Sequence, residues 1–289
     1  MSPGKARLWA GIGCVGTMVM TAVFLLSINA QMAMLPAMPR GAAHEFVAIL
    51  TFFVVVVCLM LPFDFIGGML IPAAFEDRPP KLGSWLKGWL RAVAIQVLFY
   101  SVTFFFYLQI GREIGASWLI AIFAAVQISL LAGQELIWQA MTAQRVSNAS
   151  EGLTLFVGNS DQRFVGGITG LPGFESILIP ADWKTRLQPS YLKMVLNRRR
   201  AALQSGGRFR GILFAMLWNI TSFTAAIMMS GGVILSVASL MTVFLWFLLF
   251  SFVGLLVLPM LIGLVLGRMD GGDVIYSWRG VHEIGGLVV

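Results

Sequence analysis

The stretch from Phe46 to Phe75 reads FVAILTFFVVVVCLMLPFDFIGGMLIPAAF, and Asp64 is its single charged residue. A helix needs about 20 consecutive apolar residues to cross the hydrocarbon core of a bilayer, so this stretch is long enough to do so. The whole chain agrees, because 58% of its 289 residues are apolar and only 11% are charged. Soluble domains carry about 25% charge. The sequence therefore predicts an all-α, polytopic membrane protein.

Similar apolar runs lie on both sides of this stretch. They predict about six transmembrane helices, at Leu8–Leu35, Phe46–Phe75, Leu86–Ile110, Ala116–Ala143, Gly211–Met229 and Val233–Leu266. One extended polar region falls between the fourth and the fifth of these runs. We therefore divide the chain into a four-helix region at 1–143, a small α+β insertion at 144–210, a two-helix hairpin at 211–266 and a tail at 267–289.

The distribution of Lys and Arg predicts the orientation of the chain. With the N-terminus inside, all of the 20 basic residues except Arg40 and Arg112 fall on the cytoplasmic side, as the positive-inside rule requires. Both termini and the insertion are then cytoplasmic, in an inner membrane of bacterial type. This rule, together with attraction to anionic lipid, also explains the net charge of +7, so nucleic acid is not an expected partner.

The insertion combines strand signals with a helix signal. Short β-prone runs at Leu153–Val157, Arg163–Ile168 and Ser176–Ile179 are separated by glycines and predict a small sheet. A helix is expected from Pro189 to Ser205-Gly206-Gly207, with leucines at helical spacing on one face. A unit of about 65 residues is near the lower limit for a core of its own, so we expect it to lean on the helices or on lipid.

Residues 153–266 resemble the M48 family of membrane zinc metallopeptidases, the HtpX-like enzymes. The resemblance rests on the order of RFVGG from Arg163, SILIP from Ser176 and WKTRLQPSYLKMVL from Trp183, followed by two predicted membrane helices. In that family an L-S-P stretch leads into a helix that carries the zinc motif H-E-x-x-H. The resemblance implies a peptidase-type scaffold for this part of the chain.

The zinc motif itself is replaced. When the LQP of this chain is placed on the family's L-S-P, Arg198 and Ala202 take the positions of the two histidines and Arg199 takes that of the glutamate. Arginine stays protonated and offers no lone pair to a metal. The chain's two histidines, His44 and His282, are expected on opposite sides of the membrane. The sequence thus predicts no catalytic residue, metal or cofactor, and it argues against an enzyme.

Polar residues within the apolar runs are the remaining candidates for a site. Asp64 lies in the second run, where a buried charge is costly; it either relays protons or, as we favour, forms an ion pair with Arg91 or the Arg198–Arg200 cluster. A second group shares one face of the fourth predicted helix, and its members are Gln127, Gln134, Glu135 and Gln139. This face either lines a polar path or, as we favour, fixes helix packing through hydrogen bonds.

Arg199 has two interpretations of its own. It lies on the face of Leu192, Leu196 and Leu203, so it can point inward and anchor a carboxylate. In the interpretation we favour, the Arg198–Arg200 run is instead a solvated or lipid-facing basic surface.

Two hypotheses for function follow from these patterns. The leading hypothesis is a non-catalytic M48-type scaffold that acts as a structural, assembly or regulatory partner of another membrane protein. The alternative is a small transporter or channel-like protein that uses Asp64 and the polar face of the fourth helix.

Overall fold

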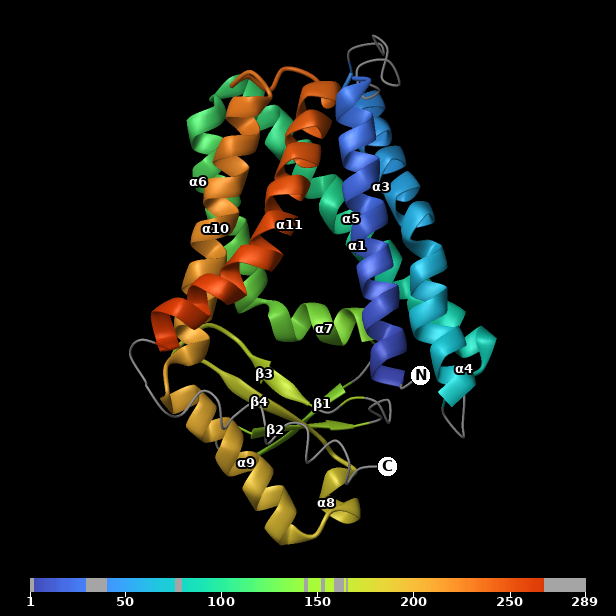
Figure 1. The fold of residues 1–289 in the computed structure, drawn as a ribbon, viewed down its shortest axis with the longest axis vertical. Coiled ribbons are helices and arrows are strands. Elements are labelled where there is room, and N and C mark those ends of the chain that lie inside the picture. The colour runs from blue at the N-terminus through green and yellow to red at the C-terminus, as the bar shows by residue number, and fades with distance from the viewer. Residues whose placement is uncertain are drawn as a thin grey trace.

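The structure, a computed structural model, describes residues 3–29, 41–75, 80–142, 145–151, 154–158, 164 and 166–267. Long helices stand side by side and a small sheet lies at one end of them (Figure 1). The long helices are α1 (Pro3–Ser27), α3 (Ala42–Phe65), α5 (Leu82–Glu113), α6 (Ala116–Ala132), α10 (Gly207–Met229) and α11 (Val237–Gly267). Among the described residues, five helices are long and apolar enough to cross a membrane, or up to six if one bent pair forms a single span. The prediction of a mostly helical chain with several helices able to span a membrane is therefore confirmed.

The bent pair is α6 and α7 (Gln134–Thr142), which meet at Gly133 at an angle of 65°. The prediction of one continuous helix at Ala116–Ala143 is wrong in this respect. Gly133 has the low helix propensity of glycine, and its N–H still bonds to the carbonyl of Ser129 at 2.8 Å. The polar residues of α7 are therefore not on the same helix axis as the apolar residues of α6. Figure 1 shows α7 lying across the end of the bundle that faces the sheet.

The second apolar run is helical throughout, but its hydrogen-bond pattern changes from α-helical to π-helical and back. Pro62 lies inside α3, and the chain continues through a π-helical segment, η1 (Ile66–Leu70), into α4 (Ile71–Phe75). A proline removes a helix hydrogen bond, and π-turns are frequent where a functional group is placed within a helix. Asp64 lies between Pro62 and η1, so its side chain projects from the irregular part of this helix.

Aromatic rings fill much of the core between the helices. Phe123 on α6 stacks on Phe223 of α10 with ring centroids 4.1 Å apart, and Phe53 on α3 meets Phe104 of α5 edge to face at 5.0 Å. Such pairs contribute about 0.5–1.5 kcal/mol beyond their burial. The tight turn between α10 and α11 agrees with the predicted hairpin, because Gly231 and Gly232 both adopt positive φ.

An ion pair joins three elements at the end of the bundle away from the sheet. Arg112 near the end of α5 donates Nη1 to Oε2 and Nη2 to Oε1 of Glu45 on α3, at 2.9 and 2.6 Å. Its Nε donates to the carbonyl of Leu235, just before α11, at 2.9 Å. This two-pronged geometry is the strong form of an Arg–carboxylate pair, and it holds α3, α5 and the α10–α11 turn together.

The insertion is a four-stranded sheet covered by helices. Its strands are β1 (Arg145–Glu151), β2 (Thr154–Gly158), β3 (Gly167–Thr169) and β4 (Ser176–Pro180), in the order β1-β2-β4-β3. The central pair β2 and β4 is parallel and both outer pairs are antiparallel. The predicted small sheet is confirmed, and the runs at Leu153–Val157 and Ser176–Ile179 match β2 and β4 where the structure describes them. The run at Arg163–Ile168 matches β3 only at its last two residues. Leu153, 159–163 and 165 lie outside the described residues. We did not predict β1, whose sequence RVSNASE has no apolar run.

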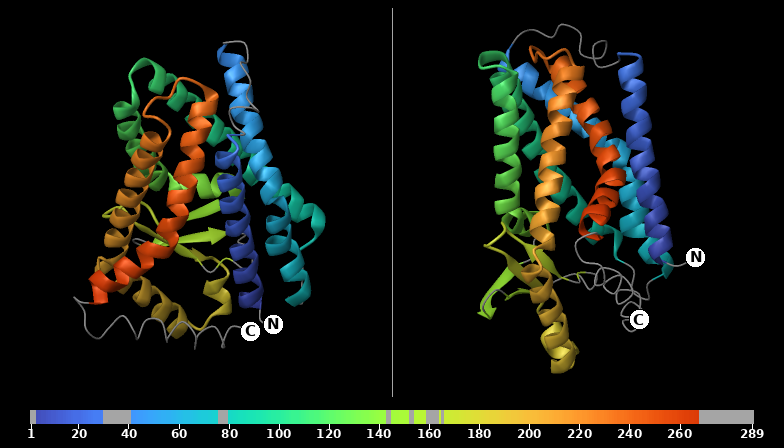
Figure 2. Two further views of the ribbon diagram at one scale, coloured as in Figure 1. Left: turned by 45° about the horizontal axis from the view of Figure 1, so that its top comes forward. Right: turned by 60° about the vertical axis from the view of Figure 1, so that its left-hand side comes forward.

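Two helices follow the sheet, α8 (Trp183–Arg186) and α9 (Pro189–Gln204). The predicted helix from Pro189 is confirmed, and it ends before Gly206, whose positive φ lets the chain turn directly into α10. Leucines of α9 pack on the sheet residues Phe156, Ile177 and Ile179. Figures 1 and 2 agree that α9 lies beyond the sheet, on the side away from the long helices.

Candidate functional site

Arg199, the residue that the resemblance aligns with the family's glutamate, lies on α9 and is built into the packing there. Its Nη1 donates to the carbonyl of Leu178 on β4 at 2.8 Å, and its guanidinium lies 6.0 Å from the ring centroid of Trp183. Burial lowers the pKa of Arg199 from its ordinary value, but an arginine stays protonated in proteins. Arg199 therefore points inward, and the interpretation that we favoured, a solvated or lipid-facing surface, is wrong for this residue. The acceptor in this contact is a main-chain carbonyl, so the anchoring of a carboxylate stays a prediction.

A glycine makes room for this arginine. Gly166 has a φ of +79°, and a Cβ at this position would collide with the guanidinium of Arg199 and with the carbonyl of Leu178. The neighbouring motif positions Arg198 and Ala202 are exposed. Within the described residues no three His, Cys, Asp or Glu side chains come close enough to hold a metal ion; His282 lies outside those residues.

A second arginine couples the insertion to the bundle. Arg208 in the first turn of α10 donates Nη1 to Glu175 at 3.2 Å and Nη2 to the carbonyl of Gly170 at 2.8 Å. Glu175 also accepts the N–H of Gly173 at 2.9 Å. The side chains of Arg208 and Glu175 are both mostly buried, so the loop between β3 and β4 is held against the start of α10.

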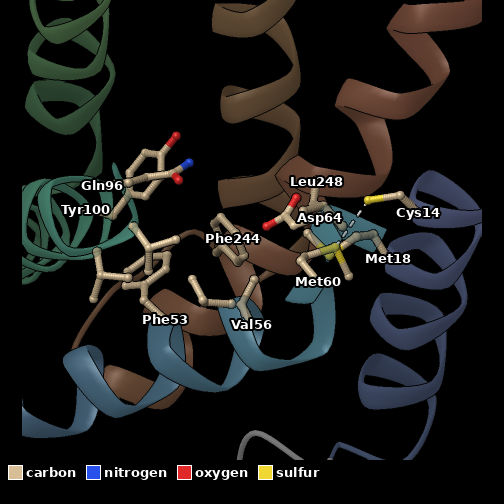
Figure 3. Close-up of a pocket in the computed structure, with 13 residues that line it drawn as sticks. Cys14, Met18, Phe53, Val56, Met60, Asp64, Gln96, Tyr100, Phe244 and Leu248 are labelled. Carbon is tan, nitrogen blue, oxygen red and sulfur yellow. Dashed lines mark hydrogen bonds between the residues drawn. The ribbon is translucent and has the colours of Figure 1, made fainter. Parts of the chain in front are cut away.

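A cavity of about 360 Å³ lies among α1, α3, α5 and α11 (Figure 3). Most of its wall is apolar. The exceptions are the carboxylate of Asp64, the amide of Gln96, the hydroxyl of Tyr100 and the thiol of Cys14. Pockets for small molecules have this character, with a largely apolar wall and a few polar groups, and range from about 300 to 1,000 Å³.

Asp64 is the one charged residue that lines the cavity. Its Oδ2 accepts a hydrogen bond from the indole of Trp89 on α5 at 2.9 Å. The predicted pairing with Arg91 is not formed, because Arg91 instead donates Nε to the carbonyl of Ala140 on α7 at 2.6 Å. Nor does an ion pair join Asp64 to the Arg198–Arg200 cluster among the described residues.

The Trp89 ring is held in place by a second indole. Trp85 lies one helical turn earlier on α5 and stacks on Trp89 with ring centroids 6.0 Å apart. Trp85 in turn lies against Gly68 in η1, where a Cβ would collide with its indole. The glycine in the π-helical segment therefore lets α5 approach closely enough for Trp89 to reach Asp64.

The polar residues predicted to share one face in the fourth span are separated by the bend at Gly133. Gln127 on α6 accepts a hydrogen bond from Asn219 of α10 at 3.0 Å. Glu135 and Gln139 lie on α7, where they bond to each other at 3.0 Å, and Gln134 on the same helix is exposed. The single polar stripe was therefore wrong, whereas the favoured packing role is confirmed for Gln127.

Comparisons with family models, with curated proteins and with solved structures find no match to this chain. The cavity is the site that we did not predict from the sequence. Its wall comes from four helices that are distant in the sequence, so no local pattern indicates it. One weak signal was present, since Gln96 is the single amide in the apolar stretch Ala92–Tyr100.

Proposed function

We propose that this chain is a membrane-embedded binding protein, a non-hydrolytic M48-type scaffold whose insertion docks a second membrane protein. In this proposal the insertion faces the cytoplasm, as the distribution of Lys and Arg favours. The observation that supports the proposal most directly is the hydrogen bond from Arg199 to the sheet. At the position of the family's catalytic glutamate, a cation donates to Leu178 at 2.8 Å and joins α9 to the sheet, which favours a role for this helix in packing and binding.

The outer face of α9 is the surface that we propose for docking. Tyr191 and Met194 are 52% and 50% exposed there, and the cations Lys193 and Arg200 lie exposed on the same helix. Apolar anchors beside positive charge favour an acidic protein surface. Because α9 lies on the side of the sheet away from the bundle (Figure 2), we expect a protein here and anionic lipid nearer to the helices.

The link between insertion and bundle supports a structural or regulatory role. Arg208 and Glu175 hold the β3–β4 loop to α10, and Trp138 of α7 packs on Phe164 of the insertion with ring centroids 5.1 Å apart. A partner bound to α9 would therefore contact a unit that these two contacts attach to the membrane helices.

The test is affinity purification from native membranes in mild detergent, followed by mass spectrometry. Wild type is expected to retain a stoichiometric membrane-protein partner, and Tyr191→Glu is expected to lose it, because a carboxylate would repel an acidic surface. Thr185→Ala, an exposed change on α8, is the matched control and should retain the partner. A wild-type protein that purifies alone, or a Tyr191→Glu variant that keeps the same partner, would contradict the proposal.

A second candidate function is that of a small transporter, and the cavity that contains Asp64 favours it. The predicted polar face of the fourth helix gives no support, because the bend divides it. In reconstituted vesicles a transporter would show saturable uptake that Asp64→Asn abolishes. Equal uptake by wild type and by this variant would exclude a role for Asp64 in transport.

A further inference from the structure

We propose that the cavity among α1, α3, α5 and α11 binds a small organic cation, with Asp64 as its counter-ion and an aromatic wall around its charge. This inference concerns a different part of the molecule from the docking surface on α9. It also holds whether or not the ligand is transported. It is drawn from the charge, the lining and the size of the cavity.

Asp64 provides the negative charge. A carboxylate among apolar membrane helices is costly unless it is paired, and the hydrogen-bond partner of Asp64 among the described residues is the neutral indole of Trp89 at 2.9 Å. One indole N–H occupies a single acceptor site, whereas an ionised carboxylate offers about four. Figure 3 shows the carboxylate turned toward the space between α3 and α5. The remaining acceptor capacity is therefore available to a cationic ligand.

Aromatic rings provide the second element of recognition. Phe53, Tyr100 and Phe244 all line the cavity, and they form one group, since Phe53 lies 5.5 Å from Tyr100 and 5.6 Å from Phe244 between ring centroids. The faces of such rings attract ammonium groups, by about 0.5 kcal/mol at exposed sites and about 2 kcal/mol when the site is desolvated. Groups of aromatic rings are a known means of recognising quaternary ammonium ligands.

The same lining argues against an inorganic cation. Calcium takes about six to eight oxygen ligands and magnesium requires an octahedron of them. The cavity offers three oxygen-bearing side chains, Asp64, Gln96 and Tyr100; apart from these and the thiol of Cys14, its wall is apolar. A ligand that brings its own apolar body would fill this wall. The volume of about 360 Å³ selects a body of roughly one ring or a short chain.

Benzyltrimethylammonium is the probe, measured by isothermal titration calorimetry on the full-length protein in lipid nanodiscs. Its uncharged carbon isostere, neopentylbenzene, and the anion benzenesulfonate control for partition into the lipid. Saturable binding of the cation alone is expected. Asp64→Asn, whose amide oxygen still accepts from Trp89, should weaken binding by roughly tenfold or more, because the charge pair is lost. Glu135→Gln, which removes a carboxylate outside the cavity, should bind as wild type does.

A second variant keeps the test decisive if Asp64→Asn fails to fold. Tyr100→Leu retains the charge and removes one ring, and it should weaken binding of the cation roughly two- to thirtyfold. A third readout is protection of Cys14 from N-ethylmaleimide by the bound cation, with Cys58, an exposed thiol that does not line the cavity, as the unprotected control. Absence of binding, equal affinity for the uncharged isostere, or unchanged binding in both variants would overturn the proposal.

Discussion

Removing Arg112 should destabilise the bundle more than removing its partner Glu45. The Arg112→Ala change removes two donors to the Glu45 carboxylate, at 2.6 and 2.9 Å, and one to the carbonyl of Leu235 at 2.9 Å. Breaking a buried pair from one side costs about 3–5 kcal/mol, because a charge stays buried without a partner. The Glu45 side chain is 11% exposed, and after the change it keeps its hydrogen bond from Gln109. We therefore expect a cost at the lower end of this range, about 3 kcal/mol.

The reverse change leaves a better-solvated charge. In Glu45→Ala the remaining Arg112 side chain is 27% exposed and keeps its bond to Leu235, so we expect a cost of about 1–2 kcal/mol. Arg112→Lys keeps the charge but loses the two-pronged geometry, and its cost should lie between those of the two alanine variants.

The assay is reversible unfolding in mixed micelles with increasing SDS, followed by tryptophan fluorescence. The double variant completes a mutant cycle, from which we expect a coupling free energy above about 1 kcal/mol. The reasoning is refuted if Glu45→Ala costs as much as Arg112→Ala, or if the coupling is zero within error.

Three further outcomes are expected. Arg199→Ala should destabilise the insertion by about 1–3 kcal/mol, because the Leu178 carbonyl loses a charged donor; limited proteolysis compares it with the exposed control Arg200→Ala, and equal resistance would speak against an inward role. Gly68→Ala should lower the melting temperature in detergent, because the added methyl group displaces Trp85. Gly67→Ala should not lower it, because a Cβ there meets nothing within 4 Å. A Gly68→Ala variant as stable as wild type would be inconsistent with close packing of Trp85 on Gly68. Elemental analysis should find zinc well below one atom per chain, as three arginines at the motif imply; full occupancy that survives dialysis would contradict the proposed non-hydrolytic scaffold.

Local patterns were sufficient for most elements of this fold, although not for β1, which has no apolar run. Apolar runs longer than a bilayer is thick predicted the helices, because a membrane helix must satisfy its own backbone and face lipid. Glycines correctly predicted the end of α9, where Gly206 has a positive φ, because glycine adopts such a backbone angle at little steric cost. They did not reveal the bend at Gly133, because one glycine within an apolar run is compatible with a straight helix.

The contacts of the candidate sites were decided by the tertiary structure. Sequence placed Asp64 in an apolar helix and offered the inward position of Arg199 only as the less favoured of two interpretations. Their partners, Trp89 and the carbonyl of Leu178, depend on how separate elements approach each other. The pair of Glu45 and Arg112 and the cavity depend on the same approach. A sequence by itself determines which residues must leave water and which backbone angles they prefer; distances between residues far apart in the chain arise only when the helices pack.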